Sequence, residues 1–154
     1  MDEAFMRKAI ELSVESVKKG GGPFGAVIVR NGEIIATGMN CVTSSNDPTA
    51  HAEVNAIREA CEKLKTFRLD DCELYASCEP CPMCLSAIYW AHIIKVYYSN
   101  SRIDAARSGF SDAFIYNEIP KMPDHRRIPC VPLMRGEGGE AFRLWHHKAD
   151  KTEY

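Results

Sequence analysis

Two short segments constrain this chain more than any other part of it: residues 48–53, Pro-Thr-Ala-His-Ala-Glu, and residues 77–84, Ser-Cys-Glu-Pro-Cys-Pro-Met-Cys. The first contains His51, and the second contains Cys81 and Cys84. A hydrolytic zinc site needs about three protein ligands and one coordination position left open for water. These residues supply that number, so we expect the two segments to meet in the fold around one zinc ion.

The spacing of the two cysteines indicates how they would bind a metal. Cys81 and Cys84 are three residues apart, and Pro80 and Pro82 mark the start of a helix. Their sulfurs therefore lie on the same side of the first turn, where backbone N–H groups and the helix dipole stabilise thiolates. His51 is expected in the first turn of a different helix, so the N-termini of two helices would face each other across the site.

Glu53 follows His51 by two residues and is the predicted proton carrier. A carboxylate beside the open position can take a proton from water and pass it to a nitrogen of the substrate. Hydrolysis of a C–N bond requires such a transfer. A zinc module that only binds a partner would not need this carboxylate. Glu53 therefore distinguishes a hydrolytic zinc enzyme from a non-catalytic binding module.

Each half of the pattern has an ordinary interpretation by itself. A Cys-x-x-Cys pair alone more often marks structural zinc or a redox site, and the metal site would be closed if Cys78 were a fourth ligand. The residue before a proline is held extended, and we expect Glu79-Pro80 to carry Cys78 away from the other two cysteines. A thioredoxin-like redox pair would leave His51 and Glu53 without a role.

The composition narrows the class of protein. The 154 residues, 45% of them hydrophobic, suit one globular domain. A formal net charge of -2 gives no positive field for a phosphate backbone, so no nucleic-acid partner is expected. No segment approaches the roughly 18 apolar residues of a membrane span, so no membrane partner is expected either. Seven cysteines are an odd number with three in one short stretch, which favours metal binding in a reducing cytoplasm over disulfides. The others are interpreted as small apolar residues: Cys41, Cys61, Cys72 and Cys130.

Hydrophobic periodicity and turn residues predict the order of helices and strands. The clearest local signal is Asn31-Gly32, which favours a two-residue hairpin turn between strands at 26–30 and 33–37. The other predicted elements are a helix at 3–18, a loop at 38–47, a helix near 50–63, a strand at 73–77, a helix opening at Pro80 and Pro82 and running to about 91, a strand at 93–98, short helices at 104–107 and 112–118, a strand at 128–134 and a helix at 140–151.

The order strand, helix, strand between residues 73 and 98 implies a parallel crossover. The predicted fold is therefore α/β, a three-layer α/β/α sandwich with a central mixed sheet. We expect one domain over residues 1–154, with residues 135–154 forming a C-terminal helix and tail.

Taken together, the two segments match the His-x-Glu and Pro-Cys-x-x-Cys signature of the zinc deaminases. The chain resembles the cytidine deaminase-like superfamily and, within it, the bacterial guanine deaminases. That second resemblance is carried by residues 22–26, 46–49, 87–91 and 109–112 and by the terminal Glu153-Tyr154. It implies hydrolysis of guanine to xanthine and ammonia in purine catabolism or salvage, with one Zn²⁺ per subunit.

The resemblance also implies contacts to a purine base. Phe24 would stack on the base, Asn40 would hydrogen-bond it, and the backbone N–H of Ala52 would receive its carbonyl. A flat purine needs an aromatic face and a few fixed polar partners, so these roles are physically reasonable. Core packing for Phe24 and loop hydrogen bonding for Asn40 are the ordinary alternatives.

Three further contacts are implied nearer the C-terminus. Asp112 would accept from the purine N–H edge or act as a second proton carrier, and Trp90 would line the pocket. An N-cap role for Asp112 and helix-core packing for Trp90 remain alternatives. Family members form homodimers that exchange their C-terminal segments, so Tyr154 would close the pocket of the partner subunit. The stretches 129–132 and 136–139 depart from the family pattern, which leaves the details of an exchange open.

Two rival activities share the metal motifs. A tRNA adenosine deaminase needs a basic surface for an RNA stem and loop, and here we find only a modest patch that we interpret as a solvated helix face: Arg143, His146, His147 and Lys148. A deaminase of cytosine, guanosine or another amino-heterocycle is the second rival. If Tyr154 caps the site, ribose has little room, so the free base is expected to be preferred.

Overall fold

The centre of the fold is a four-stranded mixed sheet with the strand order β2-β1-β3-β4. A computed structural model describes residues 2–154 of the chain. β1 (Gly25–Arg30) pairs antiparallel with both β2 (Glu33–Met39) and β3 (Cys72–Cys78), and β3 pairs parallel with β4 (Lys95–Asn100). The predicted mixed sheet and its parallel crossover are confirmed.

The turn between β1 and β2 depends on two residues that tolerate a positive φ. Asn31 has a φ of 51° and Gly32 a φ of 78°, the left-handed conformation that a two-residue hairpin turn needs at both positions. The predicted hairpin is confirmed, although β2 continues to Met39, two residues beyond its expected end.

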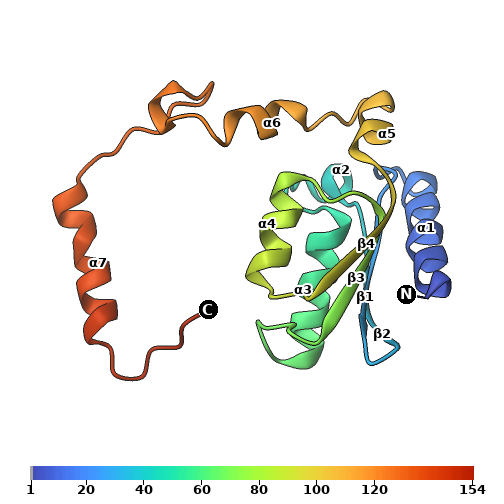
Figure 1. Cartoon of the computed structure of the whole chain (residues 1–154), viewed down its shortest axis with the longest axis horizontal. Helices are drawn as coiled ribbons and strands as arrows, with labels where there is room; N and C mark the ends of the chain where they lie inside the picture. The colour runs from blue at the N-terminus through green and yellow to red at the C-terminus, as the bar shows by residue number, and fades with distance from the viewer. Residues whose placement is uncertain (1) are drawn as a thin grey trace. The chain divides into compact units, whose positions relative to one another are not determined.

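Helices cover both faces of the sheet, as predicted. α1 (Glu3–Lys18) lies on one face, and α3 (Ala52–Leu64) and α4 (Pro82–Trp90) lie on the other (Figure 1). Side chains of β1 alternate between the two layers: Val27 and Val29 pack with α1, whereas Ala26 and Ile28 pack in the cluster that includes α3. The three-layer α/β/α architecture follows from this alternation.

Small residues bring α3 unusually close to β2. Ala52, Ala56 and Ala60 repeat every four residues on one face of α3, and all three are fully buried. A Cβ atom at Gly38 of β2 would lie 2.0 Å from the carbonyl oxygen of Ala52. Only glycine fits at this position, and the contact fixes the first turn of α3 against the end of β2.

Three boundaries differ from the predictions for local reasons. The expected loop at 38–47 contains a short helix, α2 (Val42–Ser45), which ends at Asn46 in the left-handed conformation. The strand expected at 93–98 begins two residues later, because the chain turns after α4 with a φ of 58° at His92. α5 (Arg102–Arg107) begins two residues before its expected start, at a capping box built by Ser101 and Asp104.

The described chain divides into two compact units, one extending to Asp112 and the other comprising Ala113–Tyr154. The second contains α6 (Ala113–Glu118), a 3₁₀ turn (Pro123–His125) and α7 (Arg135–His147). A single domain over residues 1–154 therefore remains a prediction.

The strand predicted at 128–134 is wrong. Residues 113–154 contain no strand, and Ile128 is 80% exposed. Pro129 and Pro132 remove two of the N–H donors that pairing would use, and β-branched side chains alone cannot make a strand without a partner. The last helix also starts five residues earlier than expected, at Arg135, and ends at His147.

No helix within residues 2–154 combines the length and the apolar character needed to cross a bilayer.

Candidate active site

Two helix N-termini carry the three predicted metal ligands. His51 is the N-cap of α3 and Cys81 the N-cap of α4, both with extended backbone. The expectation that His51 lies inside the first turn was therefore wrong by one position. Pro82 occupies the first helical position of α4, where its missing N–H costs nothing, and Cys84 follows in the same turn. The imidazole and both thiols are thus available to a metal.

The spacing of the ligand atoms fits a tetrahedral zinc ion. The Nδ1 atom of His51 lies 3.6 Å from the Sγ of Cys81 and 3.4 Å from the Sγ of Cys84. All three ligand atoms lie within 4.8 Å of one another. Zn–N and Zn–S bonds of about 2.0 and 2.3 Å at a tetrahedral angle would place N and S about 3.5 Å apart. The residues present therefore fit a zinc ion, and among residues 2–154 they are the group identified as able to hold one.

The same three groups are electrostatically coupled. The neighbouring Cys84 thiol and the His51 ring lower the pKa of Cys81 to about 4. Conversely, the adjacent Cys81 sulfur and burial raise the pKa of Cys84, and the bond with Cys81 raises the pKa of His51. Zinc binds thiolates and a neutral imidazole, so zinc binding must release any protons that these three groups hold.

Glu53 lies in the first turn of α3, two residues after His51, and is only 8% exposed. Burial raises the pKa of this carboxyl, and a negative charge on the nearby Cys81 sulfur adds to the effect. A buried carboxyl beside a metal site is uncommon outside functional sites. Its position is the one that sequence analysis assigned to the proton carrier.

Cys78 belongs to a different environment from the ligand cluster. It is the last residue of β3, and its thiol donates to the carbonyl oxygen of Ser101 at 3.6 Å. Burial raises the pKa of this thiol to about 11, so it stays protonated. The separation agrees with the extended backbone expected before Pro80.

Asn40 and Phe24 lie side by side at one end of the sheet. The backbone N–H of Asn40 donates to the carbonyl of Phe24 at 3.2 Å. The side-chain oxygen of Asn40 accepts from the backbone N–H groups of Gly22 and Val42, each at 3.3 Å. Because this oxygen is engaged, the group that Asn40 can offer to a ligand is its NH₂.

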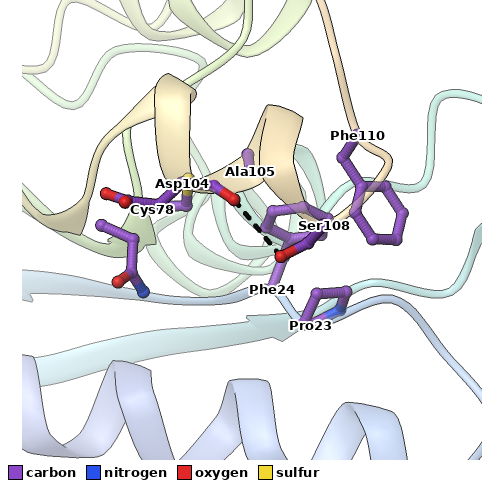
Figure 2. Close-up of a pocket in the computed structure, with 8 residues that line it drawn as sticks. Pro23, Phe24, Cys78, Asp104, Ala105, Ser108 and Phe110 are labelled. Carbon is purple, nitrogen blue, oxygen red and sulfur yellow. Dashed lines mark hydrogen bonds between the residues drawn. The ribbon is translucent and has the colours of Figure 1, made fainter.

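A cavity of about 170 Å³ lies between the Pro23-Phe24 segment and α5 (Figure 2). Phe24 meets Phe110 edge to face across it, with ring centroids 5.1 Å apart. Ser108, which donates to the carbonyl of Asp104, forms part of its wall. Sequence analysis did not assign Phe110 a role, although an aromatic residue after Gly109, whose φ is 91°, was the available signal.

The remaining predicted contacts are spread over the structure. Ala52 is fully buried as the first residue of α3, where its N–H has no partner within the helix. Asp112 is half-buried, and burial raises the pKa of its carboxyl. A negative charge on Cys81 adds to this rise, so Asp112 lies close enough to the metal cluster to interact with it electrostatically. Trp90 ends α4 and is 64% exposed, so it does not pack in the helix core. Tyr154 ends the second unit and is 73% exposed, and its role remains a prediction.

Known proteins resemble this chain along most of its length. Residues 1–100 match the cytidine and deoxycytidylate deaminase zinc-binding region. The guanine deaminase of Bacillus subtilis is 55% identical over 153 residues, covering 99% of this chain and 98% of that protein. The X-ray structure of guanine deaminase from Bacillus subtilis superposes with a TM-score of 0.97 over 100% of this chain and 99% of that one, at 54% identity. The tRNA-specific adenosine deaminase of Aquifex aeolicus is 41% identical over 85% of both chains.

These matches confirm the resemblance inferred from the two sequence segments and include both of them. With a His-Cys-Cys cluster of the right dimensions and a buried glutamate beside it, the chain belongs to the cytidine and deoxycytidylate deaminase family of zinc-binding proteins.

Proposed function

We propose that this chain is a zinc-dependent guanine deaminase that hydrolyses guanine to xanthine and ammonia in purine catabolism or salvage. The observation that carries the proposal is the cluster of His51, Cys81 and Cys84 beside the buried Glu53. It occurs in a chain that is 55% identical, nearly end to end, to a guanine deaminase.

The chemistry divides between the metal and Glu53. A zinc ion held by His51, Cys81 and Cys84 would supply the Lewis acidity that makes water nucleophilic near neutral pH. Glu53 would take one proton of that water on a carboxyl oxygen and deliver it to the ring nitrogen next to C2 of the purine, as oxygen bonds to C2. It would then carry the proton of the new hydroxyl group to the amine, as the C–N bond breaks and ammonia leaves. Glu53 is only 8% exposed, so little bulk water reaches its side chain.

Three residues at the end of the sheet would bind the base. Phe24 offers an aromatic face, and the NH₂ of Asn40 donates to an acceptor atom of the purine. The N–H of Ala52 at the helix N-terminus suits the substrate carbonyl, because this donor has no helical partner and lies at the positive end of the α3 dipole.

We also propose a homodimer in which residues of the second unit are exchanged between subunits. None of residues 113–154 is buried, and α7 exposes Phe142 and Leu144 at 72% and 65%. Large apolar surfaces of this kind gain free energy when they are buried against another chain. In this arrangement Tyr154 closes the partner's pocket, Trp90 lines it, and Asp112 accepts from the purine N–H edge.

We place the enzyme in the cytoplasm. All seven cysteines are free, and Cys130 is exposed, which suits a reducing compartment.

The similarity to tRNA-specific adenosine deaminases supports one rival activity. The test is ammonia release by the zinc-loaded protein from guanine, guanosine, cytosine, cytidine and adenine, with inosine formation in tRNA measured in parallel. We expect turnover of guanine and little of its nucleoside. Inosine in tRNA without ammonia from guanine would reverse the assignment.

A further inference from the structure

Asn55 holds both carbonyl groups that flank the metal ligand His51. It is the fourth residue of α3, and its backbone N–H donates to the carbonyl of His51 at 3.0 Å. Its side-chain Nδ2 donates to the carbonyl of the preceding residue, Ala50, at 3.3 Å. The peptide groups on either side of the His51 Cα are therefore fixed by one residue.

The same side chain also reaches the strand that leads to the predicted purine contact. Nδ2 of Asn55 donates to the carbonyl of Met39 at 2.9 Å, and Met39 is the last residue of β2, directly before Asn40. An amide NH₂ has two hydrogens, and these two bonds use both. A backbone bond from Cys41 to Ala50 at 2.9 Å closes the same junction.

We propose that Asn55 is a positioning residue that sets His51 relative to Asn40 and so couples the metal site to the purine site. It is neither one of the metal ligands nor a residue that lines the cavity near Phe24, and it acts through backbone carbonyl groups next to His51 and Asn40. The proposal has two halves. The metal half, that Asn55 positions His51 for zinc, is independent of the proposed function, whereas the purine half, that Asn55 also positions Asn40 for the base, rests on it.

The physical reason is that these two bonds are partly buried and that the amide of Asn55 is the donor that joins the Met39 and Ala50 carbonyls to α3, since their other donor, Cys41, lies in the loop itself. Removing the two donor hydrogens leaves the carbonyls of Met39 and Ala50 without the amide. The end of β2 and the segment before α3 can then shift relative to each other. Groups that orient metal ligands from behind typically change metal affinity or activity by about 10–100-fold when they are lost.

The first experiment measures zinc affinity by competition with a chelator, together with the thiolate absorption of the cobalt-loaded protein. Asn55→Leu keeps the approximate size but removes both donors, and we expect zinc binding about tenfold weaker. Asn55→Asp keeps the shape of the side chain and replaces the NH₂ donors by an oxygen. We expect the same loss of zinc affinity from it, and it serves as the test if Asn55→Leu folds poorly.

Lys63→Met is the matched control. Lys63 also lies on α3, and its Nζ donates to the carbonyl of Ile35 in β2 at 3.0 Å, far along the helix from His51. Its loss removes a helix-to-strand bond of the same kind, and we expect unchanged zinc affinity. Equal losses in Lys63→Met and Asn55→Leu would overturn the proposal, because both would then report general loosening of α3 on β2.

The second experiment measures KM and kcat for guanine at saturating zinc. We expect Asn55→Leu to raise KM about fivefold with a smaller change in kcat, and this increase to shrink in an Asn40→Ala background. An increase that persists there would overturn the coupling to Asn40.

If the wild-type protein releases no ammonia from guanine, the purine half falls with the proposed function. Wild-type zinc affinity in Asn55→Leu or Asn55→Asp would overturn the metal half.

Discussion

The unit that ends at Asp112 and the unit of residues 113–154 reach stability in different ways. Every buried residue of the described chain lies in the first unit, which packs two apolar layers against one sheet. The second unit has the helices α6 and α7 and a 3₁₀ turn, and none of its residues is buried. The metal ligands and Glu53 all belong to the first. We infer that the metal chemistry is set by one packed core, and closure of the purine site by Tyr154 remains a prediction.

The largest expected effect concerns Glu53, at the centre of the packed unit. Glu53→Gln keeps the shape of the side chain but cannot take a proton, so we expect guanine turnover to fall about 1,000-fold with zinc content unchanged. Steady-state ammonia release and metal analysis measure the two quantities. Glu62→Gln on the exposed side of α3 should stay near wild type. A Glu53→Gln enzyme with normal turnover would remove Glu53 from the mechanism.

The next effect compares glycines in the two units. A methyl group at Gly38 would meet the Ala52 carbonyl at 2.0 Å, and we expect Gly38→Ala to lower the free energy of unfolding by about 3 kcal/mol. Gly136 of α7 has no atom within 4 Å of an added Cβ, so Gly136→Ala should stabilise that helix by about 0.5 kcal/mol. Urea unfolding measures the first, and hydrogen exchange in α7 the second. Equal tolerance at both positions would contradict the contrast between the units.

Mixing two variants tests whether the second unit is exchanged. We expect Tyr154→Ala to lose about tenfold in kcat/KM, since it opens the predicted pocket. If Tyr154 acts on the partner, dimers formed from Tyr154→Ala and Glu53→Gln chains contain one complete site, and a 1:1 mixture should approach about one quarter of wild-type activity. A mixture that shows only the average of its parents would exclude the exchange.

The smallest effect is expected at Cys78. This thiol donates to Ser101 and lies outside the ligand cluster, so Cys78→Ala should bind zinc and turn over guanine within about twofold of wild type, with a stability loss of about 1 kcal/mol. Loss of zinc from this variant would mean that Cys78 is a ligand and that the site is closed.

The sequence predicted the first unit well because its signals are local and agree with one another. Asn31-Gly32 specifies its turn without help from the rest of the chain, and Pro82 specifies where α4 begins. The ligand set was equally predictable, since the i, i+3 spacing of Cys81 and Cys84 determines which side of the helix the sulfurs occupy. The N-cap position of His51 was missed because helix boundaries depend on cap geometry that spacing does not encode.

The sequence failed where the outcome depends on contacts between distant residues. Ile128 and Val131 suggested a strand, but strands form only where an edge is available, and residues 113–154 provide none. Phe110 was not assigned a role, since its edge-to-face contact with Phe24 joins residues 86 positions apart. Asn55 was missed for the same reason, because its partners lie on a strand and a loop that the helix meets only after folding.

X-ray absorption at the zinc edge of the zinc-loaded protein tests the central claim most directly. The account predicts one zinc per chain with two sulfur ligands at about 2.3 Å and two nitrogen or oxygen ligands at about 2.0 Å. Three sulfur ligands, with no oxygen from solvent, would show a closed structural site and contradict it.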